Sequence, residues 1–155
     1  MPKPPAFNPF ELPESNAIGY PPPYREDAKR RFNRRLGDHA GLKNFGVVPT
    51  RIVPSGKSSH RHAHSKQDEF VWVLEGETVL ETDAGEQVLT AGMCAGFPAG
   101  NGDAHRFLNH TDKDVLLLLL VASDRTESDE VSYPDIDMHL KRSEGFFHKD
   151  GRKYE

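Results

Sequence analysis

Short runs of β-branched and aromatic residues, separated by glycine-containing turns, fill the chain from residue 47 to residue 121. This pattern leaves no room for helices of ordinary length and predicts strands near 47–54, 59–64, 69–75, 77–82, 86–89, 95–98, 104–109 and 115–122. We expect Asp83-Ala84-Gly85 to form a hairpin turn, because glycine tolerates a positive φ. Many short strands at close spacing predict an all-β domain, either a sandwich or a small barrel.

The segments on either side of this core differ from it. Eight of the twelve prolines fall within residues 1–23, and each proline fixes φ and lacks an N–H, so we expect an extended arm without helix or central strand. Residues 24–46 are predicted to contain a short helix over 24–36 and a lead-in, because Ala28, Phe32 and Leu36 recur at helical spacing. We assign residues 47–122 to the barrel core, and residues 123–155 to a final strand and a covering tail.

Length and charge restrict the class of protein. A chain of 155 residues is the size of one domain, and its net charge of −4 argues against nucleic acid as the main partner. The basic residues of segment 25–35 are therefore interpreted as a solvated surface, with a DNA contact as the weakest alternative. The longest apolar run, 115–122, is too short to cross a bilayer, and residues 1–14 lack the apolar core of a signal peptide. We expect a cytoplasmic protein that binds no membrane.

The single cysteine, Cys94, excludes a disulfide framework within the chain. It has small or apolar neighbours on both sides and is expected to be a buried small residue rather than a nucleophile.

Histidines and one glutamate carry the candidate chemistry. His60, His62 and His64 alternate, so an extended strand would direct all three imidazoles to one face. Glu69 follows at the start of the next predicted strand, where a hairpin would return its carboxylate to the imidazoles, and His105 begins a later strand. If these side chains face a barrel interior, they converge on one point.

These residues resemble the two sequence motifs of the cupins. The first motif reads glycine, five residues, His-x-His, three or four residues, glutamate, six residues, glycine, and it is matched by Gly56, His62, His64, Glu69 and Gly76. The second is matched by Gly92, Pro98, Gly100, His105 and Asn109, except that four residues instead of two separate Gly100 from His105. The resemblance implies a single-domain jelly-roll barrel with a metal held inside by His62, His64, Glu69 and His105.

Coordination chemistry agrees with that implication. Three neutral imidazoles and one carboxylate suit a divalent transition metal such as Mn, Fe, Co, Ni, Cu or Zn, whereas Mg and Ca prefer oxygen ligands. Four protein ligands in an octahedral arrangement leave two positions open, which is typical of a reactive site. The alternative is that the histidines are inward-facing barrel residues whose neighbours satisfy them.

Two functions remain open from the sequence. The first is a metal-dependent enzyme, such as an oxygenase, decarboxylase, isomerase or lyase, acting on a small anionic or oxygen-rich substrate. The second is a binding or sensor protein that holds such a ligand without turnover. Asp103, in the loop between Gly100 and His105, is a candidate general base if it points inward. His60 is interpreted as a surface residue at the strand end, with pocket wall, ligand-orienting residue and proton carrier as alternatives.

One predicted strand has two contrasting faces. Glu69, Val71 and Val73 share one face, and the large apolar residues Phe70, Trp72 and Leu74 share the other. An apolar stripe of this size needs a cover, which the second sheet, the proline-rich arm or a second copy of the chain would provide. Alternatively, a β-bulge shifts the register and the stripe belongs to the core. The resemblance to small cupins favours the arm together with a partner subunit, and hence a homodimer.

Overall fold

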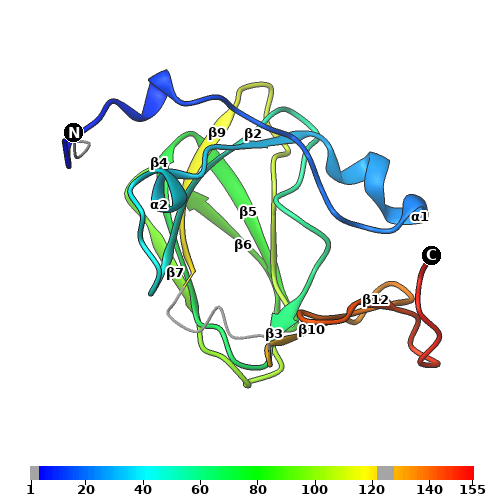
Figure 1. Ribbon diagram of the computed structural model, residues 1–155. Helices are drawn as coiled ribbons and strands as arrows, with labels where there is room; N and C mark the ends of the chain where they lie inside the picture. Colours follow the sequence, from blue (N-terminus) through cyan, green and yellow to red (C-terminus); the bar gives the residue numbers. More distant parts are fainter. Residues whose placement is uncertain (1–3, 122–127) are drawn as a thin grey trace.

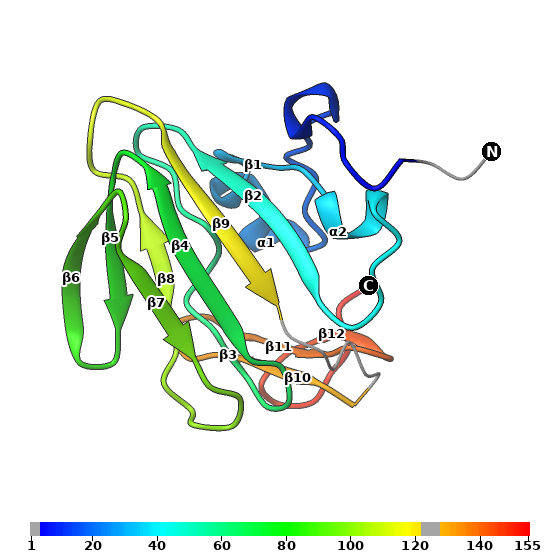
Figure 2. The ribbon, with the colours of Figure 1, turned by 90° about the vertical axis from the view of Figure 1, so that its left-hand side faces the viewer.

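Antiparallel sheets enclose the interior of this chain, which the computed structural model describes for residues 4–121 and 128–155 (Figures 1 and 2). Within those residues one sheet has the order β1 (Arg31–Asn33), β2 (Gly46–Ile52), β9 (Val115–Val121), β4 (Glu69–Glu75) and β7 (Cys94–Phe97). A second has the order β12 (Gly145–Phe147), β11 (Met138–Lys141), β10 (Glu130–Tyr133) and β3 (Ala63–His64). A third has the order β6 (Gly85–Thr90), β5 (Glu77–Thr82) and β8 (Arg106–Leu108). The prediction of an all-β jelly-roll barrel is confirmed.

The main core lies between these sheets because alternate residues of each strand point inward. It consists of large apolar side chains from six strands: Ile52, Val71, Val73, Leu80, Leu89, Phe107, Val115 and Leu117. A second cluster joins the two ends of the chain, with Tyr20 and Ala28 packed against Val131, Tyr133 and Met138. The N-terminal segment and the C-terminal strands therefore close the same side of the barrel.

Six of the predicted strands correspond to observed ones. The strands expected near 47–54, 69–75, 77–82, 86–89, 95–98 and 115–122 are β2, β4, β5, β6, β7 and β9. The hairpin turn after β5 is also confirmed, since Thr82 pairs with Gly85 and Gly85 has a φ of 117°. Residues 1–3 and 122–127, which belong to the predicted arm, barrel end and tail, lie outside the described residues.

Three predicted segments differ from the structure. The strand expected over 59–64 is regular only at β3, and the one over 104–109 is limited to β8. The tail contains the strands β10, β11 and β12 rather than a single one. Cys94 is exposed rather than buried, because the alternation of β7 turns Ala95 and Phe97 toward the core and Cys94 away from it.

The predicted helix over 24–36 is wrong. The segment forms a short α1 (Pro22–Arg25), a 3-10 turn at Glu26–Ala28, the strand β1 and a short α2 (Leu36–His39). Pairing with β2 overrides the helical spacing: Phe32 lies opposite Arg51, whose guanidinium carbon is 4.5 Å from the centre of the Phe32 ring. Tertiary contacts of this kind routinely outweigh local propensity.

The N-terminal segment contacts the body of the protein along β1 (Figure 2). The backbones of Ser15 and Asn33 exchange two hydrogen bonds of 3.0 and 2.9 Å, and the Glu14 carboxylate pairs with Arg34 and Arg51. The expectation that the segment contains no helix is wrong at α1 and at a 3-10 turn, Pro9–Glu11. Proline is accommodated there because it occupies the first turn, where its missing N–H has no intrahelical partner.

No helix in residues 4–121 or 128–155 combines the length and apolar character needed to cross a membrane.

Candidate metal centre

Strand β4 brings Glu69 to the interior of the barrel. Glu69, Val71 and Val73 are buried on its inner face, whereas Phe70, Trp72 and Leu74 are 40%, 47% and 40% exposed on the outer face. The predicted alternation is therefore confirmed, and the stripe is not part of the core.

The Glu69 carboxylate lies among three imidazoles. Its Oε2 is 2.7 Å from His105 Nε2 and 3.5 Å from His62 Nε2, and its Oε1 is 3.1 Å from His64 Nε2. One donor atom from each of Glu69, His62 and His105 lies within 4.8 Å of the others, and His64 joins this group through Glu69. The structure thus brings together all four side chains that the motif spacing selected.

Backbone pairing fixes the positions of two of these histidines. The N–H of His62 donates to the carbonyl of His105 at 3.1 Å, and the N–H of His105 donates back at 2.9 Å. The His105 ring also stacks on Phe97 at a centroid distance of 3.6 Å. The two additional residues after Gly100 therefore leave His105 within reach of the cluster. Gly100 adopts a φ of 76° and donates its N–H to the carbonyl of His64.

The outer nitrogens of two imidazoles show how the cluster suits a cation. His62 Nδ1 is 3.0 Å from the carbonyl of His60, and His64 Nδ1 is 2.8 Å from Asp129 Oδ2. Both partners can accept a hydrogen bond, and in the tautomer with its proton on Nδ1 each ring would direct an Nε2 lone pair at Glu69, which is the arrangement that metal binding requires. Lone pairs of nitrogen and carboxylate oxygen facing one another leave a place for a positive ion. The donor set therefore fits a divalent transition metal.

The ionisation of the cluster follows from its surroundings. Burial alone would raise the pKa of Glu69, but the neighbouring imidazoles hold that pKa well below its usual value. Burial lowers the pKa of His105, while Glu69 and Asp129 raise the pKa of His64 against the effect of its burial. Glu69 is therefore a carboxylate at neutral pH.

A cavity of about 220 Å³ opens beside the cluster. Its polar wall includes all four candidate ligands together with Tyr20, Arg31, Asn33, Thr50, Ser58, Ser59, Tyr133 and Arg142. Burial raises the pKa of the Tyr20 and Tyr133 phenols, so both remain protonated hydrogen-bond donors at neutral pH. The cavity is smaller than the roughly 300–1,000 Å³ typical of drug-sized ligands, which favours a small polar metabolite.

His60 is a buried residue and not a surface residue, which corrects the sequence interpretation. Its Nε2 donates to the carbonyl of Tyr24 at 2.9 Å, and its ring packs between Tyr20 and Tyr24. The chain bends at residues 58–61 instead of continuing as a strand, so the predicted alternation does not extend to His60. Its contacts attach the N-terminal segment to the barrel.

Asp103 does not line this cavity. Its Oδ1 accepts the N–H of Asp83 at 2.9 Å, so the side chain ties its loop to the hairpin turn between β5 and β6. Asp103 also lines a separate, very small pocket of about 10 Å³ with His64, Glu69 and His105, so its role as a general base stays a prediction.

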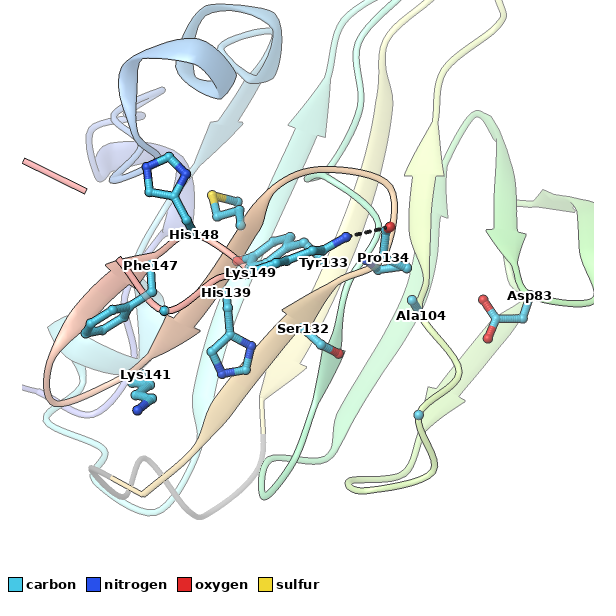
Figure 3. Close-up of a pocket in the computed structure, with 13 residues that line it drawn as sticks. Asp83, Ala104, Ser132, Tyr133, Pro134, His139, Lys141, Phe147, His148 and Lys149 are labelled. Atoms are coloured by element: carbon cyan, nitrogen blue, oxygen red, sulfur yellow. Dashed lines mark hydrogen bonds between the residues drawn. The ribbon is translucent and has the colours of Figure 1, made fainter. Parts of the chain in front are cut away.

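A larger hollow of about 460 Å³ lies against the C-terminal strands (Figure 3). Three of its polar side chains already have partners in the chain: Lys149 Nζ donates to the carbonyl of Pro134, His148 contacts Asp137, and His139 contacts Glu130. Figure 3 shows Asp83, in the turn after β5, far from Lys141 and His139 on β11, so these side chains do not converge on one point. The candidate site is therefore the smaller cavity beside Glu69.

Comparison with known proteins identifies the family. A model of the Cupin domain matches residues 50–121. A crystal structure described as a sugar phosphate isomerase from a cupin superfamily, from Silicibacter pomeroyi DSS-3, is 38% identical with a TM-score of 0.88, covering 96% of this chain and 95% of that one. This chain belongs to the cupin superfamily.

Two further solved structures show how far the similarity extends. A putative sugar phosphate isomerase from Acidithiobacillus ferrooxidans is 28% identical with a TM-score of 0.70, covering 77% of each chain. A polyketide cyclase from Streptomyces resistomycificus is 20% identical with a TM-score of 0.63, covering 81% of this chain and 87% of that one, and it shows the fold alone. A search of curated proteins found no match.

Several residues at this cupin site were not found from the sequence. Asp129 orients His64, while Arg31 and Asn33 line the cavity from β1. Asp129 is distant in sequence from the motifs and has no spacing signal. The alternation of Arg31 and Asn33 is a strand signal, but the helix assigned over 24–36 obscured it.

Proposed function

We propose that this cupin is a metal-dependent isomerase of a small sugar phosphate. The observation that carries the proposal is the buried Glu69 carboxylate, held among three imidazoles on the wall of a small polar cavity. The similarity to the protein described as a sugar phosphate isomerase supports the choice of reaction, because it extends over 96% of this chain.

In this proposal His62, His64, Glu69 and His105 hold a divalent transition metal. The metal supplies Lewis-acid polarisation of a sugar carbonyl or hydroxyl oxygen. The protonated phenols of Tyr20 and Tyr133 donate hydrogen bonds to other substrate oxygens, since both side chains line the cavity. The apolar wall around Val71 and Leu117 excludes water from the reacting carbons.

A second function, ligand binding or sensing without turnover, is favoured by one observation. Among the described residues that line the cavity, Glu69 is the only carboxylate, and every histidine there belongs to the candidate ligand set. If all four hold the metal, the cavity lacks a separate carboxylate or imidazole to accept a proton from carbon.

The experiment that separates the two functions uses the metal-loaded protein with a panel of aldose and ketose phosphates. Interconversion observed by NMR spectroscopy supports the isomerase, and retention of one compound without conversion supports the binding protein. Glu69→Gln removes the charged ligand, so we expect metal affinity to fall at least about tenfold and conversion to be lost. The matched control is Glu75→Gln on the exposed end of the same strand. Undiminished metal content of Glu69→Gln, measured by elemental mass spectrometry, would contradict the assignment.

A further inference from the structure

Two buried polar atoms on β1 lack hydrogen-bond partners among the described residues. They are Nη1 of Arg31 and Oδ1 of Asn33. The two residues are separated by one position on a strand, so their side chains lie on the same face, and both line the cavity beside Glu69. Buried polar groups in folded proteins nearly always have partners, so a pair of unpartnered atoms at one cavity calls for a physical explanation.

The surroundings of Arg31 offer its charge no counter-ion in the described part of the chain. Burial lowers the pKa of Arg31, but a guanidinium remains charged at neutral pH. Its charged or titratable neighbours are Tyr20, whose phenol is neutral, and Arg35, which repels it. The Glu69 carboxylate is engaged with three imidazoles. The second arginine of the cavity, Arg142, donates to Gln67 Oε1 at 3.0 Å and is already engaged.

An unpaired buried cation destabilises a fold unless a ligand supplies the opposite charge. The donors of a guanidinium match phosphate oxygens in charge and in spacing. The carbonyl oxygen of Asn33 is an acceptor and is complementary to a hydroxyl group. One face of β1 therefore presents a cationic donor and a neutral acceptor, which suits a phosphate ester with a hydroxyl beside it.

We propose that Arg31 and Asn33 form an anion subsite that binds the phosphate end of the ligand, across the same cavity from which Glu69 and the imidazoles bind its oxygen-rich end. The choice of a phosphate ester as the ligand rests on the proposed function. It makes Arg31 a binding residue that selects phosphorylated over neutral sugars. Both residues lie outside the segment 50–121 that matches the Cupin domain, so the subsite is an addition to the core of the barrel.

The test measures phosphate binding by the metal-free protein, so that it does not depend on turnover. Inorganic phosphate is titrated while binding is followed by calorimetry and by the melting temperature, which a ligand of the native state raises. We expect Arg31→Met to weaken phosphate binding at least about tenfold, because a charge-assisted hydrogen bond is lost. Without phosphate, the variant should melt no lower than the wild type, since it removes an unpaired and partly buried charge.

A second variant keeps the proposal testable if Arg31→Met folds poorly. Asn33→Asp supplies Arg31 with a counter-charge, so we expect a higher melting temperature together with loss of phosphate binding. The matched control is Arg35→Gln, which removes a nearby but exposed positive charge and should bind phosphate like the wild type. Acetate and a neutral sugar serve as ligand controls and should not compete with phosphate.

The outcomes separate the subsite from the isomerase. Phosphate binding that is equal in the wild type and Arg31→Met, or absent from the wild type, would overturn the subsite. Phosphate binding that depends on Arg31 supports the subsite even if no sugar phosphate is converted, a result that would contradict only the proposed reaction. If conversion does occur, a KM raised in Arg31→Met for phosphorylated substrates gives further support, and an unchanged KM counts against the subsite.

Discussion

At the scale of single residues, the four candidate ligands were predictable because their spacing follows the two cupin motifs, and the structure places the three histidines around the Glu69 carboxylate. The residues that complete the site were not predictable in the same way. Asp129 reaches His64 from a loop more than sixty positions away, and neither its type nor its neighbours distinguish it from the other acidic residues near it. Its role follows only from the fold.

Asp129 provides a prediction at this scale. Its Oδ2 faces His64 Nδ1, and its Oδ1 accepts the N–H groups of Lys66 and Gln67. Asp129→Asn keeps an oxygen that accepts the N–H groups of Lys66 and Gln67, but it presents an N–H to His64. This N–H favours the tautomer of His64 whose Nε2 is protonated. Metal affinity should fall about 10–100-fold, as measured by competition with a chromophoric chelator.

The matched control for this variant is Glu130→Gln, at an exposed neighbouring position. Equal metal affinity in the two variants would show that Asp129 does not orient His64 for binding.

At the scale of elements, strands flanked by clear turns were predictable from alternation, whereas the secondary structure of residues 24–46 was not. The helical spacing of Ala28, Phe32 and Leu36 is real, but β1 pairs with β2 and the N-terminal segment pairs with β1. The sequence of a segment does not indicate whether residues far away in the chain will provide a strand edge for it to pair with. The same limit explains why the C-terminal hairpins were underestimated, since β10 pairs with β3, more than sixty residues earlier.

The attachment of the N-terminal segment predicts a pH-dependent stability. The hydrogen bonds from Arg51 hold the pKa of Glu14 below its usual value, so its stabilising effect is complete above the unfolded pKa of about 4.3 and is lost as the pH falls through the folded pKa. Glu14→Gln should lower the free energy of unfolding by about 1 kcal/mol near pH 7, because this paired carboxylate is partly buried. The difference should shrink toward about pH 3.5.

Urea denaturation at the two pH values measures this difference, with Glu26→Gln as a control at an exposed ion pair that should have no measurable effect. A cost for Glu14→Gln that is independent of pH would mean that packing, not the charge, attaches the segment.

At the scale of the whole molecule, no element in residues 4–121 or 128–155 covers the outer face of β4. The N-terminal segment lies along β1, and neither it nor another described element covers the stripe of Phe70, Trp72 and Leu74. Of the covers considered from the sequence, a second copy of the chain is the one left. The homodimer stays a prediction.

Trp72→Glu tests it, because a charge in the centre of an apolar interface opposes association. We expect the wild type to be a dimer and the variant a monomer in light-scattering measurements after gel filtration. Val88→Glu, which changes an exposed apolar residue on β6, is the control and should remain dimeric. A monomeric wild-type protein would contradict the prediction.

The cavity draws its walls from three separate stretches of the chain. The four candidate metal ligands belong to the segment matched by the Cupin domain. Tyr20, Arg31 and Asn33 precede this segment, and Tyr133 and Arg142 follow it. The residues proposed to bind the metal and those proposed to bind the substrate are thus encoded in different stretches of the chain. In the proposed function, substitutions in the flanking stretches would change which compound is accepted and would leave in place the residues that hold the metal.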